Sequence, residues 1–351
     1  MPFQINGRII APGEPTYIIA ELSANHNQDF EQAVKLVEAA REAGADAIKL
    51  QTYTPDTITI DCRNDYFQIK GTLWDGRNLY DLYGEAYTPW DWQPKLKTVA
   101  NDLGMDLFST PFDRSAIDFL ETMGVPAYKV ASFELVDLPL IQQIAWMGKP
   151  IIMSTGMATL HEIDEAVHAA RAAGNPQIAL LKCNSAYPAP PDEMNLRSIP
   201  NMAEAFGVPV GLSDHTLGIE VPVASVALGA CIIEKHFTLS RATPGPDSTF
   251  SLEPGEFKAM VEAVRSVEKA LGRAQYGPTP HELKSMAYRR SLFAVQDIKA
   301  GDLLTEQNVR SIRPSDGLPP KYLPAVLGRR AACDIERGTP LTWDSLLGEQ
   351  A

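Results

Sequence analysis

The chain has 351 residues, of which 45% are hydrophobic, and a formal net charge of −13. A single core stops growing at roughly 250–300 residues, so this length predicts one large domain joined to a smaller one. The negative charge argues against nucleic acid and anionic membranes as partners, because both would repel the protein over a Debye length of about 8 Å. A small anionic substrate is still allowed, because nearby lysines dominate its electrostatic energy.

The cysteines and the first residues indicate the compartment. Four cysteines are widely spaced without a C-x-x-C pair, and two lie inside apolar runs, which is typical of reduced, buried thiols. The opening stretch MPFQINGRII lacks the basic and long apolar segments of a signal peptide, and no apolar run reaches about 18 residues. We therefore expect a soluble cytoplasmic protein that is not exported.

In chain order, Phe3–Ile10 with Asn6-Gly7 at its centre predicts a small hairpin. The apolar run Tyr17–Ala20 then predicts a strand that ends at Glu21, and a helix follows and stops at Gly44. The same succession of strand, polar strand end and helix recurs along the chain. The further apolar runs are Ala45–Leu50, Met105–Phe108, Ala127–Ala131, Pro150–Met153, Gln177–Leu181, Val208–Leu212 and Ala230–Ile233.

Eight such runs predict an α/β fold, a (β/α)8 barrel of the TIM type, rather than an open doubly wound sheet. The open sheet fits worse because no G-x-G-x-x-G follows the first strand and polar residues stand at every strand end. We expect the barrel domain over residues 1–272, with an aromatic-rich insertion at 52–104. A linker at 273–289 and a small β-rich domain at 290–351 follow, and the latter has too few residues for a large core.

Two histidines end the last two predicted strands. A predicted helix, Val221–Leu228, joins these strands, so they should be parallel neighbours and His215 and His236 should emerge on one rim. Neutral imidazoles there can share a divalent cation, and because catalytic zinc usually has three protein ligands, a water-rich Mn or Mg centre fits better. The alternative, that each histidine is an ordinary satisfied polar residue, stays open.

Lysines and hydroxyl groups predict an anion site on the same rim. Lysines within strand patterns, Lys49, Lys129 and with them Lys235, favour a phosphate or carboxylate guest, although ion pairs with Glu21, Glu134 or Asp214 are the alternative. The neighbouring hydroxyls are Ser109, Thr110, Ser132, Ser154 and Ser213. Glu21 and Glu134 are the candidate acid and base, and beside lysines we expect them to stay ionised.

The remaining histidines carry less weight. His26 could reach the rim from the first strand, whereas His161, His168 and His281 are expected on the surface. A metal beside an anionic substrate is compatible with aldol-type condensation, isomerisation or phosphate ester hydrolysis. The residues alone therefore predict a site without fixing its reaction.

Long segments then add a resemblance. IIAELSANHNQ, DAIKLQTYTPDTITID, YKVASFEL, PIIMSTGMATL and PVGLSDHTLGIEVPVASVALGACIIEKHFTL, among others, resemble the sialic acid synthase family over nearly the whole chain. The family implies a barrel followed by an antifreeze-like (SAF) domain, in a homodimer whose small domain covers the partner's active site. Its enzymes condense phosphoenolpyruvate with an amino-sugar aldehyde to give a nine-carbon 2-keto acid and phosphate, with cleavage of the C–O bond.

The resemblance also implies roles for particular residues. His215 and His236 would bind the cation, and Glu21 and Glu134 would handle protons. Phosphoenolpyruvate would lie against Lys49, Thr110, Lys129, Ser132, Ser154, Ser185 and Ser213. The sugar would contact Gln51, Tyr187 and Asp247, together with Arg313 from the partner's small domain. This chain has Ser315 after the Arg-Pro pair, where the family commonly has glycine.

TYTPDTIT, KGTLWDG and SAYPAP resemble the pseudaminic branch of the family, which implies a 2,4-diacetamido-2,4,6-trideoxy sugar as acceptor. The N-acetylneuraminate and legionaminate branches are the alternatives within the family. Outside it, the alternatives are an aldolase that forms a Schiff base through a lysine, and a sugar-binding protein without turnover.

Overall fold

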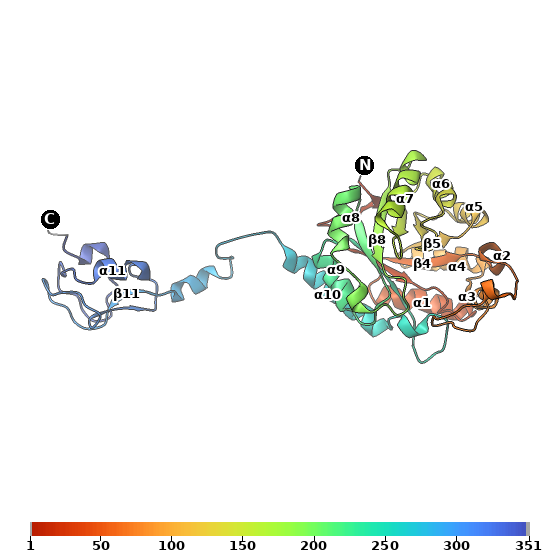
Figure 1. The fold of residues 1–351 in the computed structure, drawn as a ribbon. Coiled ribbons are helices and arrows are strands. Elements are labelled where there is room, and N and C mark those ends of the chain that lie inside the picture. Colours follow the sequence, from red (N-terminus) through yellow and green to blue (C-terminus); the bar gives the residue numbers. More distant parts are fainter. Residues whose placement is uncertain (1, 349–351) are drawn as a thin grey trace. The chain divides into compact units, whose positions relative to one another are not determined.

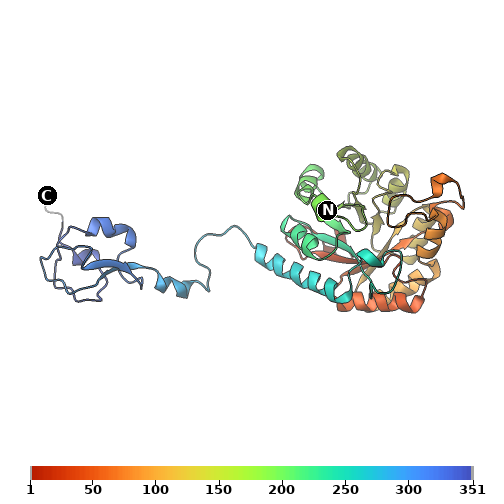
Figure 2. The ribbon, with the colours of Figure 1, turned by 60° about the horizontal axis from the view of Figure 1, so that its bottom comes forward.

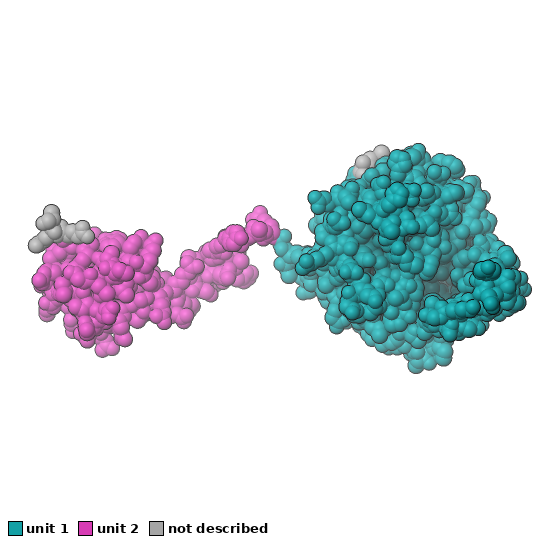
Figure 3. Space-filling model, viewed as in Figure 1, with its two compact units in different colours: residues 1–272 teal, residues 273–351 magenta. Residues whose placement is uncertain are grey.

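The computed structural model describes residues 2–348. It divides into two compact units, one up to Gly272 and one from Arg273 onward, which Figure 3 colours separately. Each unit has a hydrophobic core of its own. The two are therefore described one at a time.

The first unit is a closed barrel of eight parallel strands, as the apolar runs predicted (Figure 1). The barrel closes where β10 pairs with β3, with His236 opposite Glu21. All strands except β6 extend beyond the predicted runs, so most of the expected polar strand ends lie on the strands themselves. The strands are β3 (Tyr17–Glu21), β4 (Ala47–Thr52), β5 (Asp106–Pro111), β6 (Tyr128–Val130), β7 (Ile151–Ser154), β8 (Ile178–Cys183), β9 (Val210–Asp214) and β10 (Ile232–His236).

Helices surround the strands. Helix α1 is typical: Asp29 caps its first turn, and its buried apolar residues, among them Leu36 and Val37, belong to the same core cluster as Ile18 of β3 and Val261 of α10. Helix α10 lies against both α9 and α1 and completes the ring (Figure 2). The ring consists of α1 (Phe30–Glu42), α4 (Gln93–Asp102), α5 (Arg114–Met123), α6 (Leu138–Trp146), α7 (Leu160–Ala172), α8 (Ser198–Phe206), α9 (Glu220–Ala227) and α10 (Pro254–Leu271).

Two additions decorate the barrel. The predicted hairpin is present as β1 (Gln4–Ile5) and β2 (Arg8–Ile9). Between β4 and α4, the chain inserts α2 (Pro55–Ile58), α3 (Leu79–Ala86) and two short 3-10 turns at 65–67 and 90–92. The stretch expected as an insertion, 52–104, thus ends in a regular barrel helix.

The second unit is small and mainly built from short antiparallel pairings. It contains a 3-10 turn (Leu283–Tyr288), strands β11 (Ser291–Ala294) and β12 (Val309–Ile312), and one short helix, α11 (Leu323–Val326). Leu292, Val326 and Leu341 belong to its compact core. Within residues 2–348, no helix is long and apolar enough to cross a membrane.

Candidate active site

Three charged side chains meet inside the carboxyl-terminal end of the barrel. The Lys49 ammonium lies 2.5 Å from a Glu21 oxygen and 3.6 Å from Glu234, and all three residues are buried. Across the barrel, Lys129 Nζ lies 3.9 Å from Glu234 and donates to Ser154 Oγ at 2.6 Å. Glu234 therefore links the two lysines that the sequence placed at an anion site.

Burial and charge act in opposite directions on these groups. Burial raises the pKa of Glu21. Burial also opposes ionisation of Glu234, but Lys129 and Lys49 outweigh it and hold the pKa of Glu234 below its ordinary value. The pKa of Lys129 is lowered by burial, whereas Glu21 and Glu234 overcome burial and raise the pKa of Lys49. Glu234 is thus the fixed negative charge of the cluster.

The alternation of β10 explains why Glu234 was missed and Lys235 was misplaced. Glu234 and His236 are two residues apart and share one face of the strand, while Lys235 takes the opposite face. Completely buried, Lys235 pairs there with Asp214 and donates to the Thr216 carbonyl. The expectation that Lys235 joins the anion site is wrong, and the ion-pair alternative holds for it.

Hydroxyl groups crowd around one glycine beside the lysines. The Gly156 N–H donates to Ser132 Oγ at 3.0 Å, and a Cβ at this position would come within 2.7 Å of that oxygen and closer still to Ser185 Oγ. Only glycine allows this approach. Sequence reasoning did not single out Gly156, because nothing in its neighbourhood shows which side chains will face it. Nearby, Ser213 Oγ donates to Glu234 at 3.4 Å, while buried Thr110 Oγ1 has no hydrogen-bond partner.

The two histidine rings lie together, with centroids 5.3 Å apart. His215 Nδ1 lies 2.7 Å from the Asn184 carbonyl, which can only accept, so this nitrogen carries a hydrogen, and Nε2 has a free lone pair when the ring is neutral. Burial opposes protonation of this ring, but Cys183 and the Asn184 carbonyl outweigh it and raise the pKa of His215. Burial lowers the pKa of His236 well below its usual range, and its Nδ1 is buried without a partner. Neutral imidazoles are the form that binds metals. In residues 2–348, no three His, Cys, Asp or Glu side chains group as a metal site.

Glu134 behaves differently from what its lysine neighbours suggested. Burial raises the pKa of Glu134 to about 7, and its buried Oε2 has no hydrogen-bond partner. The expectation that this carboxyl stays ionised at neutral pH is therefore wrong, because desolvation outweighs the attraction of Lys129 and Lys49. Near pH 7 both its protonated and ionised forms are populated.

Two of the residues expected to contact the sugar, Gln51 and Asp247, are joined by a chain of hydrogen bonds at the carboxyl-terminal end of the barrel. Gln51 Nε2 donates to Glu21 Oε1 and to Ser23 Oγ, each at 3.1 Å, and the Ser23 hydroxyl donates to Asp247. The Tyr187 ring lies nearby, 4.3 Å from the ring of His215. Five segments distant in the sequence thus meet at the carboxyl-terminal end of the barrel, which we call the mouth.

Two further candidates lie elsewhere. His26 is buried between the first βα loop and the insertion, where Nε2 contacts Thr88 Oγ1 at 3.1 Å and Nδ1 accepts from the Gln28 N–H at 3.1 Å. Both nitrogens are used in joining these loops. Arg313 belongs to the second unit, where it is exposed directly after β12.

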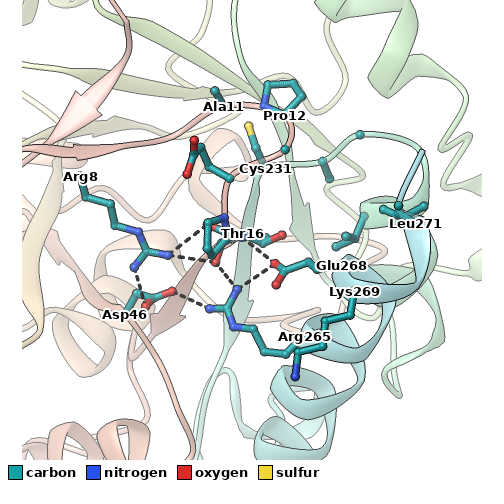
Figure 4. Close-up of a pocket in the computed structure, with 17 residues that line it drawn as sticks. Arg8, Ala11, Pro12, Thr16, Asp46, Cys231, Arg265, Glu268, Lys269 and Leu271 are labelled. Carbon is teal, nitrogen blue, oxygen red and sulfur yellow. Dashed lines mark hydrogen bonds and ion pairs between the residues drawn. The ribbon is translucent and has the colours of Figure 1, made fainter. Parts of the chain in front are cut away.

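The opposite end of the barrel has a cavity of about 870 Å³ near the starts of β3, β4 and β10. Four of the charged side chains that line it are paired: Arg8 and Arg265 both reach Asp46, at 2.6 and 3.2 Å, and Arg265 lies 2.8 Å from Glu268 (Figure 4). In barrels of this type the chemistry takes place at the carboxyl-terminal end of the strands. We therefore assign this network to stability.

Comparisons with known proteins agree with the two-unit fold. Residues 36–276 match the NeuB family and residues 289–347 match the SAF domain.

The chain is 46% identical to the pseudaminic acid synthase of Helicobacter pylori, over 95% of this chain and 98% of that protein. It is 48% identical to that of Campylobacter jejuni subsp. jejuni, over 93% of this chain and 95% of that protein. A solved structure, the N-acetylneuraminic acid (sialic acid) synthetase of Leptospira borgpetersenii, aligns with a TM-score of 0.73 at 30% identity, over 82% of this chain and 95% of that one. The chain belongs to the NeuB family, as its resemblance to sialic acid synthases predicted.

Proposed function

We propose that this chain is a pseudaminic acid synthase. It would condense phosphoenolpyruvate with 2,4-diacetamido-2,4,6-trideoxy-L-altrose to give a nine-carbon 2-keto acid and phosphate. The observation that carries the proposal is the buried cluster at the barrel mouth, where lysines, hydroxyls and two histidines meet in a NeuB-family chain. Its similarity along almost the full length to proteins named pseudaminic acid synthase supports this choice of sugar.

Phosphoenolpyruvate fits the lysine end of the cluster. Lys49 and Lys129 supply positive charge, and the hydroxyls supply donors for carboxylate and phosphate oxygens. Buried polar atoms are nearly always hydrogen-bonded, so the unpartnered Thr110 Oγ1 supports a guest in this position. The proposed contacts are Lys49, Thr110, Lys129, Ser132, Ser154, Ser185 and Ser213.

A divalent cation, Mn2+ or Mg2+, fits the histidine end. His215 and His236 would hold it, because both face the same mouth and His236 Nδ1 is buried without a partner. When bound, such a cation polarises a carbonyl oxygen. The chain's own contribution is to orient the ligands: the Asn184 carbonyl fixes the His215 tautomer, and the Tyr187 ring restrains the His215 ring.

Proton handling falls to the glutamates. In the condensation, C3 of the enol attacks the aldehyde carbon and the aldehyde oxygen takes a proton. Water then adds to C2 and gives up a proton, and cleavage of the C–O bond releases phosphate. Glu134, whose pKa is about 7, can supply or accept a proton at neutral pH. Glu21 would orient the sugar through Gln51, next to Asp247.

The second unit has the proposed role of a cover. In a homodimer, the small SAF unit of one chain would close the mouth of its partner and bring exposed Arg313 to the sugar's acyl group. Ser315 follows this Arg-Pro pair, so its loop is the part of the proposal that differs from the common family pattern. The setting of the reaction would be the cytoplasm.

The direct test measures phosphate release from phosphoenolpyruvate with a panel of 2-acetamido and 2,4-diacetamido sugars, with products identified by mass spectrometry. The 2,4-diacetamido-2,4,6-trideoxy-L-altrose should react fastest; preference for another sugar would instead indicate the N-acetylneuraminate or legionaminate reaction. In ¹⁸O-water, C–O cleavage leaves the phosphate unlabelled. Borohydride trapping of a lysine would identify a Schiff-base aldolase, and absence of turnover would identify a binding protein.

A further inference from the structure

A short hairpin in the β4–α4 insertion reaches the mouth of the barrel. Gln68 and Asn78 are bridged, Ile69 N–H donates to the Arg77 carbonyl at 2.8 Å, and Gly76 N–H donates to the Ile69 carbonyl at 3.0 Å. These contacts hold residues 68–78 as a defined turn. We call this segment the 68–78 hairpin.

Trp74 stands near the tip of the 68–78 hairpin and joins it to two other loops. Its indole N–H donates to the Pro246 carbonyl at 3.1 Å, across 172 residues, in the loop that carries Asp247. Its ring centroid lies 5.7 Å from that of Tyr187, in the loop after β8. The insertion therefore contributes a side chain to the mouth itself.

Trp74 extends an aromatic wall. The Tyr187 ring lies 5.1 Å from Phe250 and 4.3 Å from His215, and Phe250 lies 4.9 Å from His236. We call Trp74, Tyr187 and Phe250 the aromatic wall. It adjoins the paired histidines, whereas the hydrogen-bonded chain from Gln51 to Asp247 supplies the polar groups of the mouth. An acceptor sugar bound in this mouth would contact an apolar aromatic surface on one side and hydrogen-bonding groups on the other.

We propose that Trp74 is a specificity-determining residue, which favours acceptor aldehydes with methyl and acetamido groups over those with hydroxyls at the same positions. The inference rests on the proposed function and names the part of the chain that selects the sugar. The only polar hydrogen of the indole is already donated to Pro246, and the ring has no acceptor. A sugar hydroxyl packed against the ring would lose its hydrogen bonds to water and form none in their place. A methyl group there would gain binding free energy from burial of its apolar surface.

The test compares kcat/KM for two acceptors, a 2,4-diacetamido-2,4,6-trideoxy aldohexose and a 2-acetamido aldohexose with hydroxyls at C4 and C6. Trp74→Ala should reduce the preference for the first at least about tenfold, as expected when apolar contact with one or two methyl groups is lost. The KM for phosphoenolpyruvate should not change. Trp74→Phe, which keeps a ring but loses the N–H, should retain most of the preference.

The matched control is Trp146→Ala, because Trp146 is 61% exposed at the end of α6. It should leave both kcat/KM values unchanged. The inference is overturned if Trp74→Ala lowers both kcat/KM values equally, since the residue would then only support the loop, or if Trp74→Phe loses as much preference as Trp74→Ala. Wild-type protein that releases no phosphate with any sugar would instead refute the proposed function, on which this inference depends.

Discussion

The two ends of the barrel both hold charged side chains, but they use them differently. At the amino-terminal end, Arg8, Arg265, Asp46 and Glu268 form a closed network of ion pairs. At the carboxyl-terminal end, Thr110, Glu134 and His236 each keep a buried polar atom without a partner. Paired charges stabilise the fold, whereas unpartnered buried atoms cost stability unless a ligand satisfies them. The difference separates the end that holds the barrel together from the end prepared for chemistry.

Removing a histidine from the carboxyl-terminal end should give the largest effect. We expect His236→Ala or His215→Ala to reduce phosphate release about a thousandfold or more, which corresponds to about 4 kcal/mol, because the cation's polarising contribution is lost. Mn2+ binding measured by calorimetry should weaken as well. The circular dichroism spectrum should be unchanged.

The control for this prediction is His161→Ala, since His161 lies on α7 with its side chain 80% exposed. It should behave as wild type in all three measurements. Full activity of either site variant in metal-free buffer would contradict the assignment of the histidine pair.

Glu134 should make folding stability depend on pH. The folded chain holds this proton more tightly than the unfolded one, since burial moves the pKa from 4.5 to about 7. Its contribution is therefore fully present below pH about 4.5 and is lost as the pH rises through about 7, by up to about 3 kcal/mol. Chemical denaturation of wild type and Glu134→Gln at several pH values measures it. The difference in the free energy of unfolding between the two proteins should change across this pH window. A constant difference would show that the pKa of the Glu134 carboxyl is not raised.

Glu234→Gln removes the charge that links the two site lysines. We expect kcat/KM for phosphoenolpyruvate to fall about a hundredfold, as is typical when reacting groups are misplaced by about an ångström. The equivalent change in β9, Asp214→Asn, removes the charged partner of Lys235 on the other face of β10 and should cost about 3–5 kcal/mol of stability, because Lys235 is buried. Measuring activity and denaturation for both variants separates the two faces. If both variants lost activity and stability equally, one face of β10 would not serve the site while the other serves the fold.

The sequence predicted the barrel because its evidence is periodic: eight apolar runs alternate with helical patterns, and the parallel connections bring the strand ends to one rim. It also placed Lys49, Lys129 and His215 near that rim correctly. The prediction failed where a shift of one residue decides which face of a strand a side chain lies on. On a strand, a shift of one position reverses the face, so Lys235 was predicted toward the site while Glu234 was left out.

Contacts between distant segments were also beyond the sequence. Gly156 looks ordinary until Ser132 and Ser185 are seen against it, and Trp74 is one of many aromatics in the insertion until its bond to Pro246 is known. The pKa of Glu134 depends on burial, which no local pattern reveals. The type and spacing of polar residues can thus be read from the sequence. The burial of a side chain and the contacts between distant loops can be known only from the folded structure.

The smallest effect is expected at the amino-terminal end. One Asp46 oxygen pairs with Arg8, and the other accepts from the Ile18 N–H at 2.9 Å and faces Arg265. Asp46→Asn keeps the size of the side chain but removes the charge shared by two arginines. The free energy of unfolding should therefore fall by about 1–3 kcal/mol. For a barrel of this size the melting temperature should fall by several degrees, about 2–4 °C per kcal/mol, while kcat/KM stays at the wild-type value. Asp118→Asn is the control, because the pair of Asp118 with Arg114 is exposed and worth little. A loss of activity in Asp46→Asn without a loss of stability would reverse the division of roles between the two ends of the barrel.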